Sequence, residues 1–376
     1  MSAPFTLYEF FAGGGMARIG LGESWSCAFA NDFDPVKARA WRANFADDRK
    51  FREGDVWALE AADLPGRADL AWASSPCQDF SLAGARAGLA GGRSGAFFGF
   101  WRLIEALSAE GRAPRNLVIE NVTGLFTANN GRDFAALCAA LAAQNYRFGA
   151  LEIDAARFLP QSRPRVFVVA TLGPTPGPLL GESPFHTRLV TAAHAKLPAE
   201  LARRWVWWGL PAPPSRNTDL AAMLEPDAAV DWHDAAQTAR LLELMAPLHR
   251  ARVTAVAASG ARAVGSVFRR TRMENGRRTQ RAEVRFDGLA GCLRTPRGGS
   301  SRQSIIVIEA GLVRSRLLSP REAARLMGLP EGYALPTAAT AALHVTGDGV
   351  AVPVVRWLSN HILEPLLQRN AMLAAE

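Results

Sequence analysis

The chain has 376 residues, of which 49% are hydrophobic and 21% are charged. At roughly 100–200 residues per domain this length suggests two domains, and the composition excludes disordered, collagen-like and low-complexity proteins. No apolar run reaches the ~18 residues that would cross a bilayer, and the N-terminus lacks a secretory signal, so we expect no membrane segment. The four cysteines lack metal-ligand spacing, which predicts free thiols in a reducing cytoplasm and no metal site.

The charge balance of the chain is basic. Lys and Arg together number 43 against 35 Asp and Glu, which gives a net charge of +8, and only three of the basic residues are lysines. The planar guanidinium group of arginine suits phosphates and guanine edges. Basic charge alone is weak evidence, but it makes nucleic acid a candidate partner.

The first half of the chain alternates apolar, strand-like runs with helical stretches. We expect strands over Thr6–Phe11, Ser26–Ala30, Leu70–Ser74, Leu117–Glu120 and Val166–Thr171. We expect helices between them over Pro35–Phe45, Ala96–Ala109 and Asp133–Gln144. This alternation predicts an α/β fold with a parallel sheet covered by helices on both faces, and ligands of such folds gather at the C-terminal ends of the strands.

The pattern changes after Thr171. Gly173–Pro184 is rich in Pro and Gly, and Trp205–Pro214 holds three tryptophans, so this region reads as a linker or a packing strap. Arg262–Arg302 is expected to be irregular and carries eleven arginines against three acids. Further helices are expected over Ala235–His249, over Ser319–Gly328 with a capping box, and from Val350 past Leu366.

A glycine-rich turn follows the first expected strand, in the run Phe11-Ala12-Gly13-Gly14-Gly15. It opens a helix whose N-terminus attracts negative charge. The next two strands end near Asp32 and Asp55, where a carboxylate can bind ribose hydroxyls or an adenine amino group. Each feature alone is better explained by turn glycines and capping acids, but together they predict a cofactor that carries a nucleoside.

Three groups with catalytic chemistry lie at strand ends. Cys77 follows Pro76 beside a Gly-rich loop, which suits an activated nucleophile better than a buried core thiol. Glu120 ends an apolar strand, where a poorly hydrated pocket can hold a carboxyl protonated, although a surface acid is an equal alternative. Arg163 and Arg165 lie two residues apart on an extended segment, so they are expected to point the same way and clamp an anion or a carbonyl, unless they form a solvated basic edge.

These segments together resemble the DNA (cytosine-5)-methyltransferases of bacteria. The resemblance rests on six motifs in order: Phe11-Ala12-Gly13-x-Gly15, Pro76-Cys77-Gln78, Glu120-Asn121-Val122, Gln161-x-Arg163-x-Arg165, Leu317–Gly328 and Gly347–Pro353. The motifs bracket nearly the whole chain. Any one of them is a weak to moderate signal, whereas six in the correct order are very specific.

The resemblance implies the reaction and its catalytic residues. Members of the family transfer a methyl group from S-adenosylmethionine, leaving S-adenosylhomocysteine, to carbon 5 of a cytosine that is flipped out of double-stranded DNA. By the match, Cys77 is the nucleophile that attacks carbon 6, and Glu120 holds or protonates N3. Arg163 and Arg165 are expected to fix the base, polarise its carbonyl or position the backbone.

The resemblance also implies a Rossmann-like S-adenosylmethionine-dependent methyltransferase sheet with helices on both faces and a smaller irregular target-recognition domain. Residues 1–175 and 345–376 are expected to form a discontinuous catalytic and cofactor-binding domain, and residues 176–344 the target-recognition domain. The cofactor pocket is expected to contain Phe11, Gly13, Gly15, Asp32, Phe33, Asp55, Pro76, Asp348 and Val350. DNA contacts are expected from Gln78, Ser81, Arg277, Arg278, Arg294, Arg297 and Arg302.

Three other functions are alternatives to this one. An RNA cytosine methyltransferase with the same catalytic set usually carries a Cys-Phe-Thr segment and lacks a large recognition domain, which does not fit this sequence. A non-catalytic DNA-binding relative is disfavoured by the intact catalytic positions, and a dinucleotide oxidoreductase by the absent G-x-G-x-x-G. We expect a monomeric cytoplasmic protein that joins the nucleoid when bound to DNA, and the sequence leaves open whether a cognate restriction endonuclease accompanies it.

Overall fold

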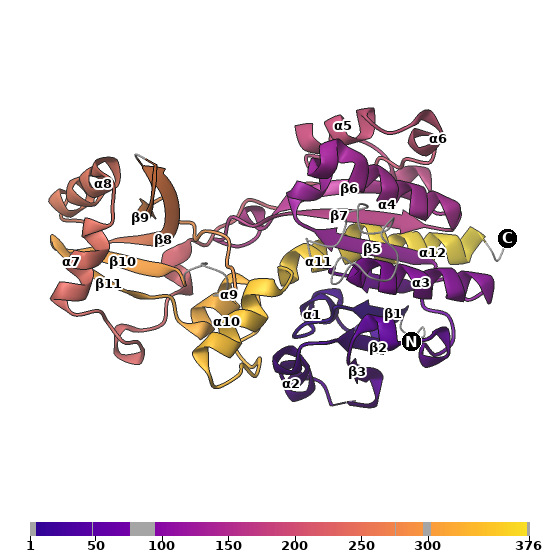
Figure 1. Cartoon of the computed structure of the whole chain (residues 1–376), viewed down its shortest axis with the longest axis horizontal. Helices are drawn as coiled ribbons and strands as arrows, with labels where there is room; N and C mark the ends of the chain where they lie inside the picture. The colour runs from indigo at the N-terminus through magenta and orange to yellow at the C-terminus, as the bar shows by residue number, and fades with distance from the viewer. Residues whose placement is uncertain (1–4, 47, 76–94, 275, 296–301, 374–376) are drawn as a thin grey trace. The chain divides into compact units, whose positions relative to one another are not determined.

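The computed structural model describes residues 5–46, 48–75, 95–274, 276–295 and 302–373 (Figure 1). These residues divide into two compact units. The first takes the described residues of Met1–Asp154, Pro164–Pro214 and Val352–Glu376, and the second takes those of Ala155–Arg163 and Ser215–Ala351. None of the helices in the described ranges is long and apolar enough to cross a membrane.

A seven-stranded sheet is the centre of the first unit. Its strands are β1 (Phe5–Phe10), β2 (Trp25–Asp32), β3 (Phe51–Glu53), β4 (Leu70–Ala73), β5 (Asn116–Asn121), β6 (Arg147–Asp154) and β7 (Pro164–Thr171). The order is β3-β2-β1-β4-β5-β7-β6, parallel from β3 to β5, with β7 antiparallel to both neighbours. The α/β class is confirmed, but the sheet is mixed rather than wholly parallel. Only residues 155–163 join β6 to β7, too few for the crossover that parallel strands need.

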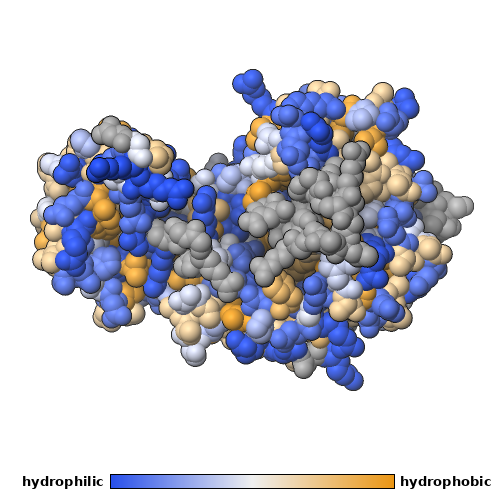
Figure 2. Space-filling view, viewed as in Figure 1, coloured by the Kyte–Doolittle hydropathy of each residue, from blue (hydrophilic) through white to orange (hydrophobic). Residues whose placement is uncertain are grey.

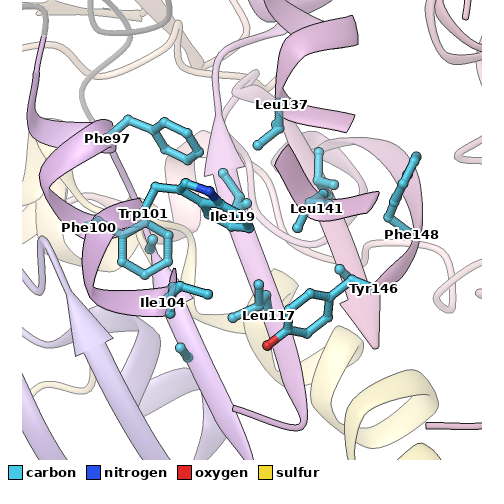
Figure 3. Close-up of a cluster of buried hydrophobic side chains, with 14 of the residues drawn as sticks. Phe97, Phe100, Trp101, Ile104, Leu117, Ile119, Leu137, Leu141, Tyr146 and Phe148 are labelled. Atoms are coloured by element: carbon cyan, nitrogen blue, oxygen red, sulfur yellow. The ribbon is translucent and has the colours of Figure 1, made fainter. Parts of the chain in front are cut away.

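Helices cover both faces of this sheet. They are α1 (Met16–Leu21) and α2 (Pro35–Asn44) on one face and α3 (Ala96–Ala109) and α4 (Arg132–Ala143) on the other. Successive side chains of β1 alternate between the faces: Tyr8 and Phe10 join the cluster around α3, whereas Glu9 accepts a hydrogen bond from the backbone of Arg18 in α1. Figure 3 shows the core between α3, β5 and α4, where Phe97, Phe100, Trp101, Leu117, Ile119, Leu137 and Leu141 pack together.

The C-terminal segment returns to the first unit. It comprises α11 (Val352–Leu358), a π-helical turn (Ser359–Leu363) and α12 (Glu364–Leu373), so the helix expected from Val350 begins at Val352 and contains a π turn. Gly20 of α1 allows the close approach of α11, because a Cβ there would lie 2.4 Å from the Cβ of Val355. The indole of Trp25 in β2 donates to the Ser359 hydroxyl at 2.9 Å, which ties the π turn to the sheet.

The Trp-rich strap also belongs to the first unit. It follows α5 (Arg188–Ala195) and α6 (Ala199–Ala202). Val206 N donates to Phe148 O at 2.7 Å, and the Trp208 indole donates to Val169 O at 3.1 Å, so this segment packs along β6 and β7. The compact units divide after Pro214 and after Ala351, and the assignment of residues 1–175 and 345–376 to a catalytic domain and of 176–344 to a target-recognition domain stays a prediction.

The second unit contains a four-stranded antiparallel sheet. Its strands are β8 (Ala263–Glu274), β9 (Arg277–Arg285), β10 (Ser304–Glu309) and β11 (Leu312–Leu317), in the order β11-β10-β8-β9. The expectation that Arg262–Arg302 is irregular is wrong over β8 and β9. The sequence concealed these strands because their outer residues are exposed on both faces, so apolar and polar residues do not alternate there.

Helices accompany this second sheet. The helix expected over Ala235–His249 is in fact two helices, α7 (Ala235–Glu243) and α8 (Pro247–Ala258), because Pro247 lacks the amide hydrogen that a continuous helix needs. They pack on the core formed by Val267, Ala282, Val284 and neighbouring aliphatic residues. The remaining helices are α9 (Pro320–Leu326) and α10 (Ala339–Asp348). The capping box predicted at Ser319 is confirmed, since Glu322 N donates to its hydroxyl at 3.1 Å.

Candidate active site

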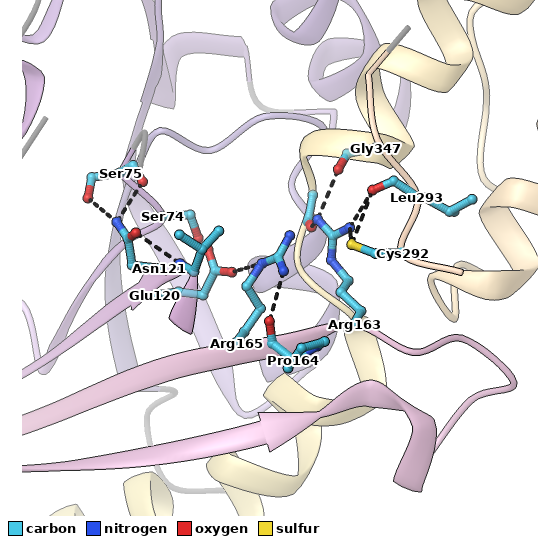
Figure 4. Close-up of polar contacts among 12 residues, drawn as sticks. Ser74, Ser75, Glu120, Asn121, Arg163, Pro164, Arg165, Cys292, Leu293 and Gly347 are labelled. Carbon is cyan, nitrogen blue, oxygen red and sulfur yellow. Dashed lines mark hydrogen bonds and ion pairs between the residues drawn. The ribbon is translucent and has the colours of Figure 1, made fainter. Parts of the chain in front are cut away.

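The segment expected to carry the nucleophile begins directly after β4. Pro76, Cys77, Gln78 and Ser81 lie outside the described residues, but the residues that precede them are anchored (Figure 4). The side-chain amide of Asn121, the last residue of β5, donates to Ser75 O at 3.1 Å and lies 3.4 Å from its hydroxyl. Asn121 therefore fixes the point from which this segment leaves the sheet. The motif Glu120-Asn121-Val122 was the signal for this residue, although the sequence alone gave Asn121 no role.

Glu120 and Arg165 form an ion pair at the same end of the sheet. Glu120 Oε1 lies 3.2 Å from Arg165 Nε, and the two side chains are 8% and 16% exposed. They come from β5 and β7, which pair directly, with Glu120 opposite Phe167. Arg165 also donates from Nη1 to Pro164 O at 2.9 Å. The pair presents a nearly buried carboxyl whose orientation is held by a cation, which suits hydrogen bonding to a ligand that enters beside it.

Arg163 holds backbone carbonyls of the second unit. Its guanidinium donates from Nη1 to Leu293 O at 2.9 Å, and from Nη2 to Gly347 O at 2.9 Å and Gly349 O at 2.7 Å. The residue is only 2% exposed. The guanidinium groups of Arg163 and Arg165 contact different groups of the protein, and a joint clamp on one ligand stays a prediction. Of the roles expected for Arg163, positioning of the backbone fits these contacts.

Gln161, two residues before Arg163, also holds backbone groups of the second unit. It is fully buried, and its amide donates to Leu326 O at 2.7 Å while accepting from Leu293 N at 3.0 Å. Gln161 and Arg163 thus hold both polar groups of Leu293, and Gln161 links that residue to the end of α9. The spacing Gln161-x-Arg163 marked this residue in the sequence, but only the structure gives it a positioning role.

The glycine-rich turn between β1 and α1 forms a cradle. Phe11, Gly13 and Gly15 all have positive φ, at 54°, 56° and 78°. A Cβ on Gly15 would lie 2.2 Å from the ring of Phe45, so this glycine is required by packing, whereas a Cβ on Gly13 would meet nothing within 4 Å. The turn is therefore tight on its inner side and open at Gly13, where a ligand can approach the backbone.

Acidic residues fix this turn against the ends of β2 and β3. Asp32 is 4% exposed, and its two oxygens accept from Gly13 N at 2.8 Å and Asp34 N at 2.9 Å. Burial raises the pKa of Asp32. Asp55 caps the 3-10 turn Val56–Ala58 by accepting from Trp57 N at 3.0 Å. Phe33 lies between these acids in the sequence and is 67% exposed, which leaves its ring free to stack on a flat ligand.

Glu9 is a buried carboxyl that sequence reasoning missed. It is 1% exposed in β1 and accepts from Arg18 N at 3.2 Å. Desolvation raises its pKa to about 7, against the smaller opposing effect of Arg18. No motif in the sequence marks it, because a single Glu in a strand reads as an edge or surface acid. Glu9 is therefore a buried acid that can hold its proton near neutral pH.

The two residues expected from the C-terminal motif lie in the second unit. Asp348 pairs with His344, at 3.2 Å between Oδ2 and Nε2, and accepts a hydrogen bond from the Thr295 hydroxyl. Val350 is 4% exposed. These contacts fix the loop after α10, and a cofactor contact from Asp348 and Val350 stays a prediction.

The arginines expected to contact DNA differ in their surroundings. Arg277 and Arg278 are exposed in β9, and Arg294 is exposed after Leu293. Arg302 is half-buried, donates from Nε to Leu318 O at 2.6 Å, and has a pKa lowered mainly by desolvation. Arg297 lies outside the described residues. In the part of the chain that the structure describes, no cluster of His, Cys, Asp and Glu could hold a metal ion.

Comparison with known families and proteins gives one consistent result. The family model for C-5 cytosine-specific DNA methylases matches residues 5–364. The type II methyltransferase M1.ScrFI of Lactococcus lactis subsp. cremoris is 26% identical over 370 residues, which cover 97% of this chain and 79% of that protein. The type II methyltransferase M.SsoII of Shigella sonnei is 25% identical over 367 residues, covering 96% and 81%.

A solved structure shares the fold. The Dnmt2 methyltransferase of S. pombe superposes with a TM-score of 0.61 at 16% identity, over 96% of this chain and 99% of that one. At this identity the likeness supports the architecture alone. Together with the family match, it accounts for both the strand-end motifs and the mixed sheet.

Proposed function

Because this chain belongs to the C-5 cytosine-specific DNA methylases and is a DNA (cytosine-5-)-methyltransferase, we propose that it methylates carbon 5 of a cytosine flipped out of a specific double-stranded DNA sequence. The methyl donor is S-adenosylmethionine, and Cys77 forms a transient bond to carbon 6 of the base. The observation that carries this proposal is the buried Glu120–Arg165 pair, because Glu120 lies on β5, the strand next to the anchored end of β4 that leads to Cys77.

The cradle at the end of β1 fits the proposed cofactor. S-adenosylmethionine supplies a methyl group on a positively charged sulfur. The open backbone at Gly13 would admit its methionine part, and the exposed ring of Phe33 would stack on its adenine. Asp32 and Asp55 would accept hydrogen bonds from the ribose and the adenine amino group, using lone pairs that their capping contacts leave available. The other proposed cofactor contacts are Phe11, Gly15, Pro76, Asp348 and Val350.

Cys77 has the most demanding chemical role. Carbon 5 of cytosine is a poor nucleophile, and a thiolate bond to carbon 6 makes the ring electron-rich at carbon 5. After the methyl group is transferred, loss of the proton from carbon 5 expels the thiolate and restores the ring. The anchoring of Ser75 by Asn121 supports this role by fixing the strand end from which the Cys77 segment departs.

Glu120 would hold N3 of the flipped base while Cys77 attacks. Its carboxyl is nearly buried, so a hydrogen bond or a shared proton at N3 is not diluted by water. Arg165 orients this carboxyl and carries donors for the carbonyl of the base. Arg163 would have a positioning role, because it fixes the backbone at Leu293, Gly347 and Gly349.

The matched relatives are named as type II methyltransferases, which suggests a fixed recognition site and a cognate restriction endonuclease that acts separately. We propose a monomeric protein that works in the cytoplasm on the nucleoid. Gln78, Ser81, Arg294, Arg297 and Arg302 are proposed DNA contacts, together with the exposed Arg277 and Arg278.

The test is methyl transfer to defined nucleic acids. The protein is incubated with labelled S-adenosylmethionine and either duplex DNA or RNA, and a plasmid from expressing cells is sequenced after bisulfite treatment. The proposal expects label on DNA alone and protected cytosines within one sequence. Label on RNA alone, or labelled DNA without protected cytosines, would contradict it.

A further inference from the structure

The outer part of the β8–β9 hairpin is a two-stranded ribbon. β10 pairs with β8 only from Ala263 to Val267, whereas β9 continues to pair with β8 as far as Glu274. Seven residues of β8, Phe268–Glu274, therefore extend beyond the four-stranded sheet. At ~3.3 Å per residue this arm is roughly 20 Å long.

One face of the ribbon carries arginines together with two carboxylates. Alternation along paired strands places Arg270, Arg272, Arg277, Arg281, Glu274 and Glu283 on the same face. Arg272 donates from Nε to Glu283 at 3.0 Å, Arg270 lies 3.7 Å from the same carboxylate, and Arg281 donates to Glu274 at 2.8 Å. Arg270, Arg272 and Arg281 thus have fixed carboxylate partners within the hairpin, and both acidic groups of the ribbon lie on this face.

The other face is the outward continuation of the core face. Close to the sheet it carries Val267, Ala282 and Val284, which are buried with α7 and α8. Beyond them the helical cover ends, and five exposed side chains follow. They are Arg269, Thr271, Met273, Gln280 and Arg278.

The arginines on this exposed face have no carboxylate partner among the described residues. Among the described residues no carboxylate forms an ion pair with Arg269 or Arg278, in contrast to Arg270, Arg272 and Arg281 on the opposite face. Met273 is 66% exposed, although it is large and apolar. Figure 2 shows that the surface over β8 and β9 is mainly hydrophilic, and the neighbours of Met273 on its own face, Thr271 and Arg278, are polar.

We propose that the face formed by Arg269, Thr271, Met273, Arg278 and Gln280 reads base edges in the major groove of duplex DNA, an inference that rests on the proposed function. The major groove admits a two-stranded ribbon. Arginine can bind O6 and N7 of guanine, glutamine N6 and N7 of adenine, and an apolar group the thymine methyl. The face that holds ion pairs points away from the bases. Site preference is therefore set mainly by this face.

The test compares neighbouring arginines on opposite faces. Arg269→Ala and Arg270→Ala each remove one exposed positive charge from adjacent positions of β8, but only Arg269 lies on the proposed reading face. Each variant, and Arg278→Ala, is expressed with a plasmid library in which the sequences flanking cytosine are randomised. Bisulfite sequencing then gives the ratio of methylation at the parent site to that at sites with one base changed.

We expect Arg269→Ala and Arg278→Ala to lower this ratio by roughly 5- to 150-fold at one base position, and Arg270→Ala to leave it unchanged. An unchanged ratio in both reading-face variants, or an equal loss in Arg270→Ala, would overturn the inference. So would a uniform fall at all sites with the ratio preserved, which would mark phosphate contacts. The wild-type protein distinguishes failure of the proposed function from failure of the reading-face assignment. If the wild-type protein protects no cytosine, the proposed function itself is wrong. Melting curves of all variants confirm that the hairpin remains folded.

Discussion

Arg163 is 2% exposed and donates to three backbone carbonyls, whereas Arg278 is exposed and forms no ion pair with a described carboxylate. The same guanidinium group therefore serves two purposes in the two regions. At the strand ends, burial and several fixed acceptors convert it into a rigid support. On the outer hairpin its hydrogen-bonding capacity is kept for a ligand, and its charge acts through water, where salt screens it.

The comparison extends to the carboxylates. Glu120 and Glu9 are almost inaccessible to water. A Glu→Gln substitution at either position therefore alters a carboxyl group whose interactions water does not weaken. Glu274 and Glu283 on the hairpin lie at or near the surface, and ion pairs of this kind contribute little to stability. Changes at the strand ends should therefore have large effects that depend on pH or on the chemical step. Changes on the hairpin should have smaller effects that depend on salt or on DNA sequence.

The largest effect is expected for Cys77→Ser. A serine hydroxyl is almost un-ionised at neutral pH, so methyl transfer should fall by about 10³-fold or more while DNA and cofactor binding persist. DNA with 5-fluorocytosine at the target should trap the wild-type protein in an adduct that resists SDS. An adduct that still forms with Cys77→Ser would show that another residue is the nucleophile.

Glu120→Gln should come next. Gln has nearly the same shape but cannot supply the proton that N3 needs in the transition state, so kcat should fall by roughly 10²–10⁴-fold with little change in DNA affinity. Steady-state kinetics at saturating DNA measure this change. An increase in KM with unaltered kcat would mean that Glu120 only binds the substrate. The strand ends would then no longer differ from the hairpin in acting on the chemical step.

The third prediction concerns Glu9 and pH. Its pKa is raised from 4.5 to about 7 in the folded protein, so the folded state holds this proton more tightly than the unfolded chain. The resulting stabilisation is complete below pH 4.5 and is lost as the pH rises through 7. At 1.36 kcal/mol per pKa unit the loss is about 3 kcal/mol.

Glu9→Gln removes this titration while keeping an oxygen that can accept from Arg18 N. Its free energy of unfolding, measured by denaturation at several pH values, should exceed that of the wild-type protein by an amount that grows between pH 4.5 and 8. The matched control is Glu23→Gln, because Glu23 is exposed. Parallel pH profiles of the wild-type and Glu9→Gln proteins would refute the raised pKa.

The sequence predicted the strand-end region well because each feature there is local. The strands at Leu70–Ala73 and Asn116–Asn121 are short apolar runs that end in polar motif residues, and both were expected within two residues of their bounds. The antiparallel pairing of β6 with β7 was missed, because it depends on the length of a connection rather than on composition. The role of Arg163 was open for a similar reason, since its acceptors are backbone groups more than a hundred residues away.

The hairpin was harder to predict. An apolar/polar alternation identifies a strand only where one face is buried, and here both faces of the outer half carry polar residues. The composition indicated a nucleic-acid partner, but composition alone does not distinguish one arginine of this region from another. Register separates them, since a shift by one residue exchanges the two faces.

The smallest expected effect is that of Arg277→Ala on the salt dependence of DNA binding. Arg277 and Arg278 are consecutive and exposed, but they lie on opposite faces of β9. If Arg277 meets a phosphate at the wall of the groove, its removal should reduce the slope of log affinity against log salt by about 0.9 without changing site preference. Arg278→Ala should change site preference with little change in slope, because a guanine edge releases no condensed counterion.

Binding titrations on the parent site and on one mismatched duplex, at several salt concentrations, measure both quantities. Equal slopes and equal preferences for the two variants would mean that the faces of the ribbon are not distinct. A reduced slope in Arg278→Ala alone would place the phosphate contacts on the face proposed to read bases, and the assignment of the two faces would be reversed.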